Sequence, residues 1–192
     1  MQDFKLIDFI VQKNVIPKDL CKELIEVTAN DHWQKHQWYV ATDDKNMSYD
    51  EKELDVLFPD PVITNKLFEI VVGNFAEYFK ICKPLHSEIN YLRTVNNCCG
   101  IRLNRYNAGT LMRPHIDHIH SLFDGYQKGI PVLSMIGVLN DDYEGGDLVF
   151  FEDHEIKTQV GDIIIFPSCF LYPHSIKEIT KGSRYSFVSW AW

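Results

Sequence analysis

Hydrophobic side chains recur at helical spacing in two stretches of the first third of the chain. Residues 17–30 begin with Pro17, which suits the first turn of a helix, and place Leu20, Leu24 and Val27 on one face. Residues 60–80 lie between Asp60–Pro61 and Pro84 and repeat apolar side chains with the same period: Ile63, Leu67, Ile70 with Val71, Phe75 and Phe79. The pattern predicts two amphipathic helices. The polar stretch 41–53 between them is predicted to be a loop, either a solvated connection or a mobile lid.

From about residue 85 the pattern changes to short apolar runs separated by turn signals. These signals are Asn107-Ala-Gly109, Gly145–Gly146, Gly161–Asp162 and Lys181–Gly182. The predicted strands cover residues 86–95, 100–106, 111–118, 132–139, 147–152, 155–160, 162–167, 173–178 and 183–191. Segment 119–130 is predicted to be a longer, glycine-containing loop.

Many short strands after two helices indicate a mainly β fold with N-terminal helices, of the α+β class. We expect a two-sheet sandwich or jelly roll packed against the helices. No change in composition marks a linker, so residues 1–192 are predicted to form a single domain. Within it, helical support would occupy about 1–84 and the β core about 85–192.

Charge and cysteine content narrow the class of partner and the compartment. The 192 residues include 19 Lys and Arg against 27 Asp and Glu, a formal net charge of −8. Binding to nucleic-acid backbones or anionic membranes depends on basic patches, so neither partner is expected. No apolar run approaches the roughly 20 residues of a membrane span, and charged residues interrupt the N-terminal apolar stretch that a secretory signal would need. Five cysteines, an odd number with no CxxC pair, favour reduced thiols and a cytoplasmic protein. The sequence does not indicate an oligomeric state.

One histidine cluster has the spacing of a metal site. In a strand, residues two apart point to the same side, so His115 and Asp117 can offer an imidazole nitrogen and a carboxylate oxygen to one cation. His174 follows Pro173 near the start of a later predicted strand and is the candidate third ligand. Two histidines and one carboxylate leave metal positions open, as in non-haem Fe(II) oxygenases. The HxD motif by itself is weak, because a single histidine is more often a surface residue or a hydrogen-bonded core residue.

Other histidines form competing clusters. His118 and His120 share the opposite strand face and have no carboxylate beside them. His86-Ser-Glu88 has the same spacing as His115-Ile-Asp117 but no obvious later partner, and His154 lies at a predicted hairpin tip. We interpret these histidines as solvated positions.

A cationic side chain follows the third candidate ligand. Arg184 and Ser186 lie two apart on a predicted strand, and Val188 and Trp190 continue the same face with apolar bulk. The guanidinium is therefore expected to point inward, where an unpaired charge would be costly. A buried arginine beside a hydroxyl suits one carboxylate of a dicarboxylate ligand.

Four segments together resemble a known family. RYNAGTLMRPHIDH, VLNDDYEGGDLVFF, VGDIIIFPSCFLYPH and GSRYSFVSW are similar to the 2-oxoglutarate- and Fe(II)-dependent oxygenases of the prolyl 4-hydroxylase type. The similarity covers about residues 98–192, half of the chain. Each motif alone means little, but chance agreement of the whole ordered series is improbable.

The resemblance implies a double-stranded β-helix with a defined set of site residues. Iron would be held by His115, Asp117 and His174, and Arg184 would pair with the C5 carboxylate of 2-oxoglutarate. The remaining cosubstrate positions are Tyr106, whose hydroxyl would reach the cosubstrate, Ser186 of the R-x-S motif, and Trp190 near the iron. Such an enzyme needs Fe(II), consumes 2-oxoglutarate and O₂, releases succinate and CO₂, and uses ascorbate as reductant. One departure is Val138, which stands where some prolyl hydroxylases carry a tyrosine that contacts the cosubstrate.

The resemblance favours a prolyl residue of a peptide or protein as the substrate. Arg102 and Asn104 share the strand face of Tyr106 and are candidate substrate contacts; a solvated strand face is the alternative. The aromatic side chains of Trp33, Trp38 and Tyr39 are expected to fill the helix–sheet interface rather than to bind proline.

Two other functions stay open. One is an oxygenase for a free amino acid, another small molecule, another side chain or a nucleic-acid base. The acidic composition argues against nucleic acid, as does the lack of further arginines after Arg184. The other is a non-catalytic metal-binding jelly-roll module. The HxD…H set together with Arg184 argues against it, because a binding module does not need all four residues.

Overall fold

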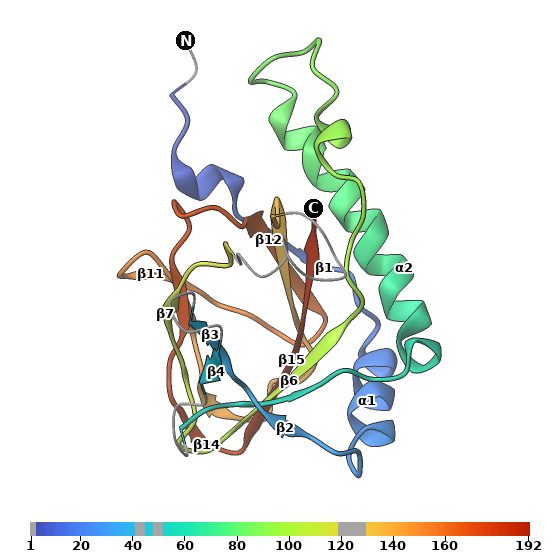
Figure 1. Ribbon diagram of the computed structural model, residues 1–192, viewed down its shortest axis with the longest axis vertical. Helices are drawn as coiled ribbons and strands as arrows, with labels where there is room; N and C mark the ends of the chain where they lie inside the picture. The colour runs from blue at the N-terminus through green and yellow to red at the C-terminus, as the bar shows by residue number, and fades with distance from the viewer. Residues whose placement is uncertain (1–2, 41–44, 48–51, 119–129) are drawn as a thin grey trace.

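Two antiparallel β-sheets face each other in the structure, a computed structural model that describes residues 3–40, 45–47, 52–118 and 130–192 (Figure 1). In the described chain the larger sheet has seven strands, in the order β1 (Val11–Asn14), β12 (Asp162–Pro167), β8 (Leu133–Val138), β15 (Ser183–Ala191), β6 (Arg102–Asn107), β5 (Asp55–Leu57) and β2 (Gln34–Lys35). The smaller sheet has four, in the order β11 (His154–Ile156), β10 (Leu148–Phe150), β13 (His174–Ile176) and β7 (Met112–His115). Two further pairs are β14 (Ile179–Lys181) with β9 (Glu144–Gly145), and β3 (Trp38–Val40) with β4 (Lys45–Met47).

Strand β12 shows how the larger sheet separates two hydrophobic cores. Its continuous apolar run is buried on both faces, because successive side chains point to opposite sides. Ile163 and Ile165 belong to the core shared with the helices. Ile164 and Phe166 belong to the core between the two sheets. Both cores are needed to cover this sheet.

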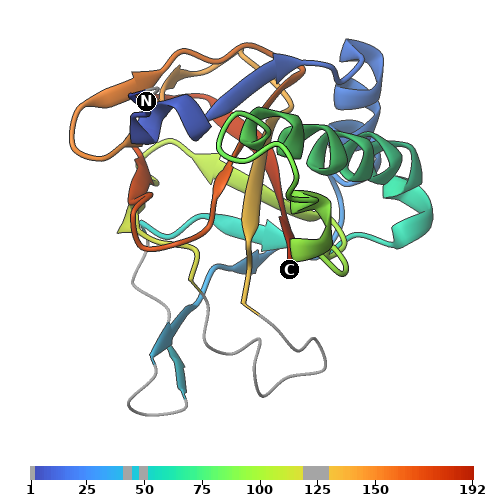
Figure 2. The same ribbon diagram turned by 90° about the horizontal axis from the view of Figure 1, so that it is seen from above.

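Two helices, α1 (Lys18–Val27) and α2 (Pro61–Tyr78), cover the outer face of the larger sheet (Figure 2). Asp60 caps α2 by accepting a hydrogen bond from the backbone N–H of Val62 at 2.8 Å, and Pro61 takes the first helical position. Three 3-10 turns complete the helical elements of the described residues: η1 (Leu6–Phe9), η2 (Phe79–Cys82) and η3 (Tyr91–Thr94). Both predicted helices are therefore present, each ending two or three residues before its predicted boundary.

The predicted apolar faces of the helices are only partly buried. Leu24 and Leu67 are fully covered, but Val27 is 49% exposed and Ile63 is 38% exposed. Both line a surface crevice between the two helices. The helices thus meet the sheet and each other along a narrower stripe than the apolar faces that the periodicity predicts.

The predicted strand over residues 86–95 is absent. Backbone hydrogen bonds there are local: the N–H of Ile89 bonds the carbonyl of His86, and the N–H of Arg93 bonds the carbonyl of Asn90. The segment forms turns and η3 instead of pairing with a strand.

The first third of the chain is not only helical support. Strand β1 pairs with β12, and β5 pairs with β6, so residues before 84 supply both edges of the larger sheet. These strands have four residues or fewer, too few for a periodic signal.

The two predicted loops lie largely outside the described residues. For segment 119–130 only Ile130 is described, and within 41–53 the described part is β4 with residues 52 and 53. All five cysteines are free; Cys21 and Cys82 are buried, and the other three are half-buried. Within the described residues, we find no helix long and apolar enough to cross a membrane.

Candidate metal and cosubstrate site

Strands β7 and β13 bring the two predicted histidine ligands together. His115 at the end of β7 is the register partner of His174 at the start of β13. Asp117 lies beyond the strand, which ends earlier than the predicted 111–118, yet its Oδ1 is 3.4 Å from His115 Nε2 and 3.9 Å from His174 Nε2. The three ligand atoms lie within 4.8 Å of one another. In the described part of the chain, no other group of three His, Cys, Asp or Glu side chains is this close.

Hydrogen bonds orient each of the three side chains. Nδ1 of His115 lies 2.8 Å from the carbonyl of Arg113, and Nδ1 of His174 lies 3.2 Å from the carbonyl of Tyr172. A protonated Nδ1 donates to each carbonyl, which leaves the Nε2 lone pair free to bind a metal. The indole Nε1 of Trp190 donates to Oδ2 of Asp117 at 3.0 Å, so Oδ1 alone is turned toward the histidines.

The protonation states of the group also suit a metal. Burial lowers the pKa of His174 to about 4, against the opposing effect of Asp117. Burial raises the pKa of Asp117, but the neighbouring His174 and His115 outweigh it and hold that pKa below its ordinary value. A neutral imidazole and an ionised carboxylate are the forms that bind a divalent cation.

Arg184 is fully buried at the other end of the same pocket. It is 1% exposed, stands opposite Tyr106 in the β15–β6 register, and its Cζ lies 5.2 Å from the Tyr106 ring centroid. Nη1 donates to Ser186 Oγ at 2.9 Å, whereas Nε and Nη2 have no hydrogen-bond partner among the residues that the structure describes. Buried donors without acceptors are costly, so these two N–H groups fit a carboxylate that binds between them and the trio.

One pocket contains all nine residues that the sequence singles out. Its lining comprises Arg102, Asn104, Tyr106, Met112, His115, Asp117, Ile136, His174, Ile176, Arg184, Ser186, Val188 and Trp190. Arg102 Nε donates to Asn104 Oδ1 at 3.2 Å, and Arg102 Cζ lies 5.0 Å from the ring centroid of Trp190. The trio of His115, Asp117 and His174 and the buried arginine therefore line one pocket, part of whose wall is apolar.

Comparison with known proteins agrees with this geometry. Residues 101–192 match the family model of the 2OG-Fe(II) oxygenase superfamily. The sequence of this half of the chain thus resembles that superfamily. A PKHD-type hydroxylase of Stenotrophomonas maltophilia (strain R551-3) is 32% identical over 94 residues, which are 46% of this chain and 41% of that protein. A PKHD-type hydroxylase of Hyphomonas neptunium is 34% identical over 96 residues, 46% of this chain and 41% of that protein. The chain spans less than half the length of these curated relatives.

Solved structures show a likeness of fold over nearly the whole chain. A prolyl hydroxylase from Trichoplax adhaerens, in complex with a peptide fragment of the hypoxia inducible factor oxygen degradation domain, superposes with a TM-score of 0.71 at 15% identity, over 96% of this chain and 84% of that one. A Pseudomonas putida prolyl-4-hydroxylase superposes with a TM-score of 0.65 at 14% identity, over 95% of this chain and 91% of that one. At such identities the likeness shows the fold alone. The predicted double-stranded β-helix and the predicted family resemblance are confirmed.

The departure at Val138 has a simple structural counterpart. Val138 is fully buried between the two sheets, and Ile136 is the residue of β8 that lines the pocket. No tyrosine of β8 reaches the pocket, since the strand has none. The phenol that faces Arg184 comes from Tyr106 of β6.

The competing histidines stay outside the trio. His86, His118 and His154 do not join it, and His120 lies outside the described residues. His86 is in the turn region before η3, and His154 begins β11 after the predicted hairpin turn.

A second group of buried side chains, missed by the sequence analysis, supports the site. The Trp38 ring lies 5.4 Å from the His115 ring, edge to face. Glu53 is 3% exposed; its Oε1 accepts a hydrogen bond from Trp38 Nε1 at 3.0 Å, and its Oε2 lies 3.3 Å from His36 Nδ1.

The expectation that Trp38 fills the helix–sheet interface is therefore wrong, because the Trp38 ring packs beside His115, one of the candidate metal ligands. Trp33 does pack there, 6.2 Å from the ring of Tyr185. The side chain of Tyr39 lies outside the described part.

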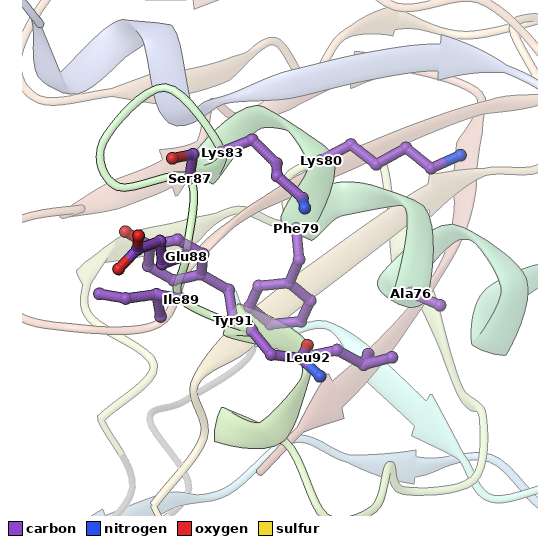
Figure 3. Close-up of a pocket in the computed structure, with 10 residues that line it drawn as sticks. Ala76, Phe79, Lys80, Lys83, Ser87, Glu88, Ile89, Tyr91 and Leu92 are labelled. Atoms are coloured by element: carbon purple, nitrogen blue, oxygen red, sulfur yellow. The ribbon is translucent and has the colours of Figure 1, made fainter.

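Figure 3 shows a second hollow, between the end of α2, η2 and residues 87–92. It has a volume of about 420 Å³, and Phe79, Tyr91 and Leu92 lie at its centre. None of its lining residues lines the pocket of the trio, and it contains no histidine, aspartate or cysteine. The candidate metal ligands and this hollow are thus two separate places in the described structure.

Proposed function

We propose that the protein is a 2-oxoglutarate- and Fe(II)-dependent hydroxylase that acts on prolyl residues of a peptide or protein. The observation that carries this proposal is the pair of unpartnered N–H groups on buried Arg184, in the same pocket as the trio. A metal-binding module would not need a buried cation there. A dicarboxylate that reaches from the metal to Arg184 would supply the missing acceptors.

Each residue of the pocket would have a defined task. His115 Nε2, Asp117 Oδ1 and His174 Nε2 would hold Fe(II) and leave further positions open. Arg184 would bind the distal carboxylate of 2-oxoglutarate, with Ser186 holding its Nη1 and Tyr106 beside it. Bound iron supplies the redox chemistry that couples decarboxylation of 2-oxoglutarate by O₂ to hydroxylation of a C–H bond. The aliphatic wall of Met112, Ile136 and Ile176 would exclude water.

The prolyl substrate is supported by likeness. Prolyl hydroxylases share the fold, and a PKHD-type hydroxylase is 32% identical over 94 residues. By the same reasoning we propose ascorbate as the reductant. The five free thiols support action in a reducing compartment such as the cytoplasm.

The test is turnover by the purified protein with Fe(II), 2-oxoglutarate, O₂ and ascorbate. We expect succinate to form, and a panel of proline-containing peptides to gain the mass of one oxygen atom on proline. His174→Ala should bind no Fe(II) and form no succinate, while His86→Ala, outside the pocket, should retain both. Absence of succinate from iron-loaded wild type with every peptide would overturn the hydroxylase proposal. Oxygen found only on another residue type would overturn the prolyl substrate.

A further inference from the structure

We infer that Arg102 forms a second anion subsite, which binds a carboxylate of the substrate next to the C–H bond to be hydroxylated. The inference rests on the proposed function and adds the chemical class of the substrate. The carboxylate can be the free carboxyl group of an amino acid or C-terminal residue, or an Asp or Glu side chain beside the proline.

The two arginines of the pocket are too far apart to bind one carboxylate. In the β15–β6 register Arg184 stands opposite Tyr106, and Val188 stands opposite Arg102. Tyr106 and Arg102 are four residues apart on β6, which separates their backbones by about 13 Å. Arg184 therefore serves one end of the pocket and Arg102 the other.

Contacts hold Arg102 at the end where the metal ligands lie. Its guanidinium lies against Trp190, whose indole donates to Asp117. Its Nε donates to Asn104, which is 2% exposed. Two contacts thus fix the side chain beside the place where a substrate C–H must come.

Arg102 keeps donors for a ligand. In the part of the chain that the structure describes, neither Nη has a hydrogen-bond acceptor, and no carboxylate lies within 4.0 Å. Arg105, the other arginine of β6, points to the opposite face and is paired with Asp55 at 3.0 Å. One arginine of the strand is thus neutralised by the protein itself, and the one inside the pocket is not.

The charges of the loaded pocket leave Arg102 without a counter-charge. Asp117 neutralises only part of a divalent metal ion, and the two carboxylates of 2-oxoglutarate would meet the metal and Arg184. Arg102 remains a partly buried cation, which an anionic substrate would stabilise. A substrate with a positive charge at this place would be repelled.

The test measures equilibrium binding to the Fe(II)- and 2-oxoglutarate-loaded protein without O₂, so that binding is read apart from turnover. One arm uses a peptide with an internal proline flanked by Glu, Gln or Lys. The other arm uses L-proline and a peptide that ends in proline, each against its C-terminal amide. We expect wild type to prefer the carboxylate form in at least one arm by about tenfold or more. The arm that shows the preference identifies the source of the carboxylate.

Variants assign the preference to this residue. Arg102→Met should abolish it, Arg102→Lys should retain part of it, and both should bind Fe(II) and 2-oxoglutarate like wild type. Arg93→Glu, on the exposed surface of η3, changes the net charge without changing the preference. Equal binding of carboxylate and amide forms by wild type, or an unchanged preference in Arg102→Met, would overturn the inference. The inference would also be overturned if Arg102→Met lost only affinity for Fe(II). That result would show that Arg102 positions Trp190 and does not bind the substrate. Failure of the hydroxylase proposal would instead appear as absent succinate with binding intact.

Discussion

The indole of Trp190 donates a hydrogen bond to Oδ2 of Asp117, the carboxylate oxygen turned away from His115 and His174. Trp190 lies on β15 of the larger sheet, whereas His115 and His174 lie on the smaller one. The hydrogen bond therefore links the two sheets at the metal site and fixes which oxygen faces the histidines.

Replacing this donor should weaken metal binding without unfolding the protein. Trp190→Phe keeps the aromatic packing but removes the N–H, so Asp117 can rotate. Changes to residues that orient a metal ligand cost roughly ten- to hundredfold in affinity. Titration of wild type and Trp190→Phe with Fe(II) under nitrogen measures the two affinities directly. Trp33→Phe, whose indole bonds the carbonyl of Thr28 away from the trio, should leave Fe(II) affinity unchanged. Equal affinities for the two variants would contradict the role of Trp190.

Arg184 should limit the stability of the unliganded protein and support that of the liganded one. Arg184→Met removes a buried cation with two unpaired N–H groups, so the metal-free protein should unfold at an equal or higher urea concentration. With Fe(II) present and O₂ excluded, 2-oxoglutarate at a hundred times its Kd should stabilise wild type by about 2.7 kcal/mol and the variant hardly at all. Arg105→Met is the contrast, because it leaves Asp55 without its arginine and should destabilise the protein in both states. A full ligand-induced stabilisation of Arg184→Met would show that the cosubstrate binds elsewhere.

Glu53 should be a stabilising residue although it lies at the end of a polar stretch of sequence. Glu53→Ala leaves the Trp38 indole and the His36 ring without their buried acceptor. Each unsatisfied group costs about 1–3 kcal/mol, which urea denaturation resolves. Glu144→Ala removes only an exposed ion pair with Lys181 and should change the unfolding free energy by less than about 0.5 kcal/mol. If both variants were equally stable, the buried role of Glu53 would be wrong.

Gly137 in β8 should not tolerate a side chain. A Cβ there would lie 1.8 Å from the ring of Phe187, the opposite residue on β15. Gly137→Ala should cost about 1–3 kcal/mol or more, seen as a lower melting temperature or a loss of folded protein. Gly100→Ala meets nothing within 4 Å and should be tolerated. Adding Phe187→Leu to Gly137→Ala should recover part of the loss, since the smaller side chain can move aside.

The fold could be predicted where local pattern and buried surface agree. The long helix before residue 80 and the apolar strands 162–167 and 183–191 carry a repeat long enough to identify their type. The strand predicted over residues 86–95 is absent, because a short run between turn signals predicts an extended conformation but cannot supply a partner strand. The short strands β1, β2 and β5 were missed, because so few residues carry no period. Only their pairing in the sheet defines them: β1 with β12, β5 with β6, and β2 with β5.

For the candidate site too, the sequence determined one part of the description and the tertiary structure the other. The sequence by itself determined the kinds of atoms available: two imidazoles, a carboxylate and a guanidinium, in an order that resembles one family. Only the tertiary structure decided that His115 faces His174 across β7 and β13. It also decided that Arg184 is buried without a full set of acceptors among the described residues. The packing of Trp38 against His115, and its hydrogen bond to Glu53, likewise come from the tertiary structure. The physical reason is that side-chain chemistry is a property of each residue, whereas distance, burial and an unsatisfied charge arise only when segments far apart in the chain pack against one another.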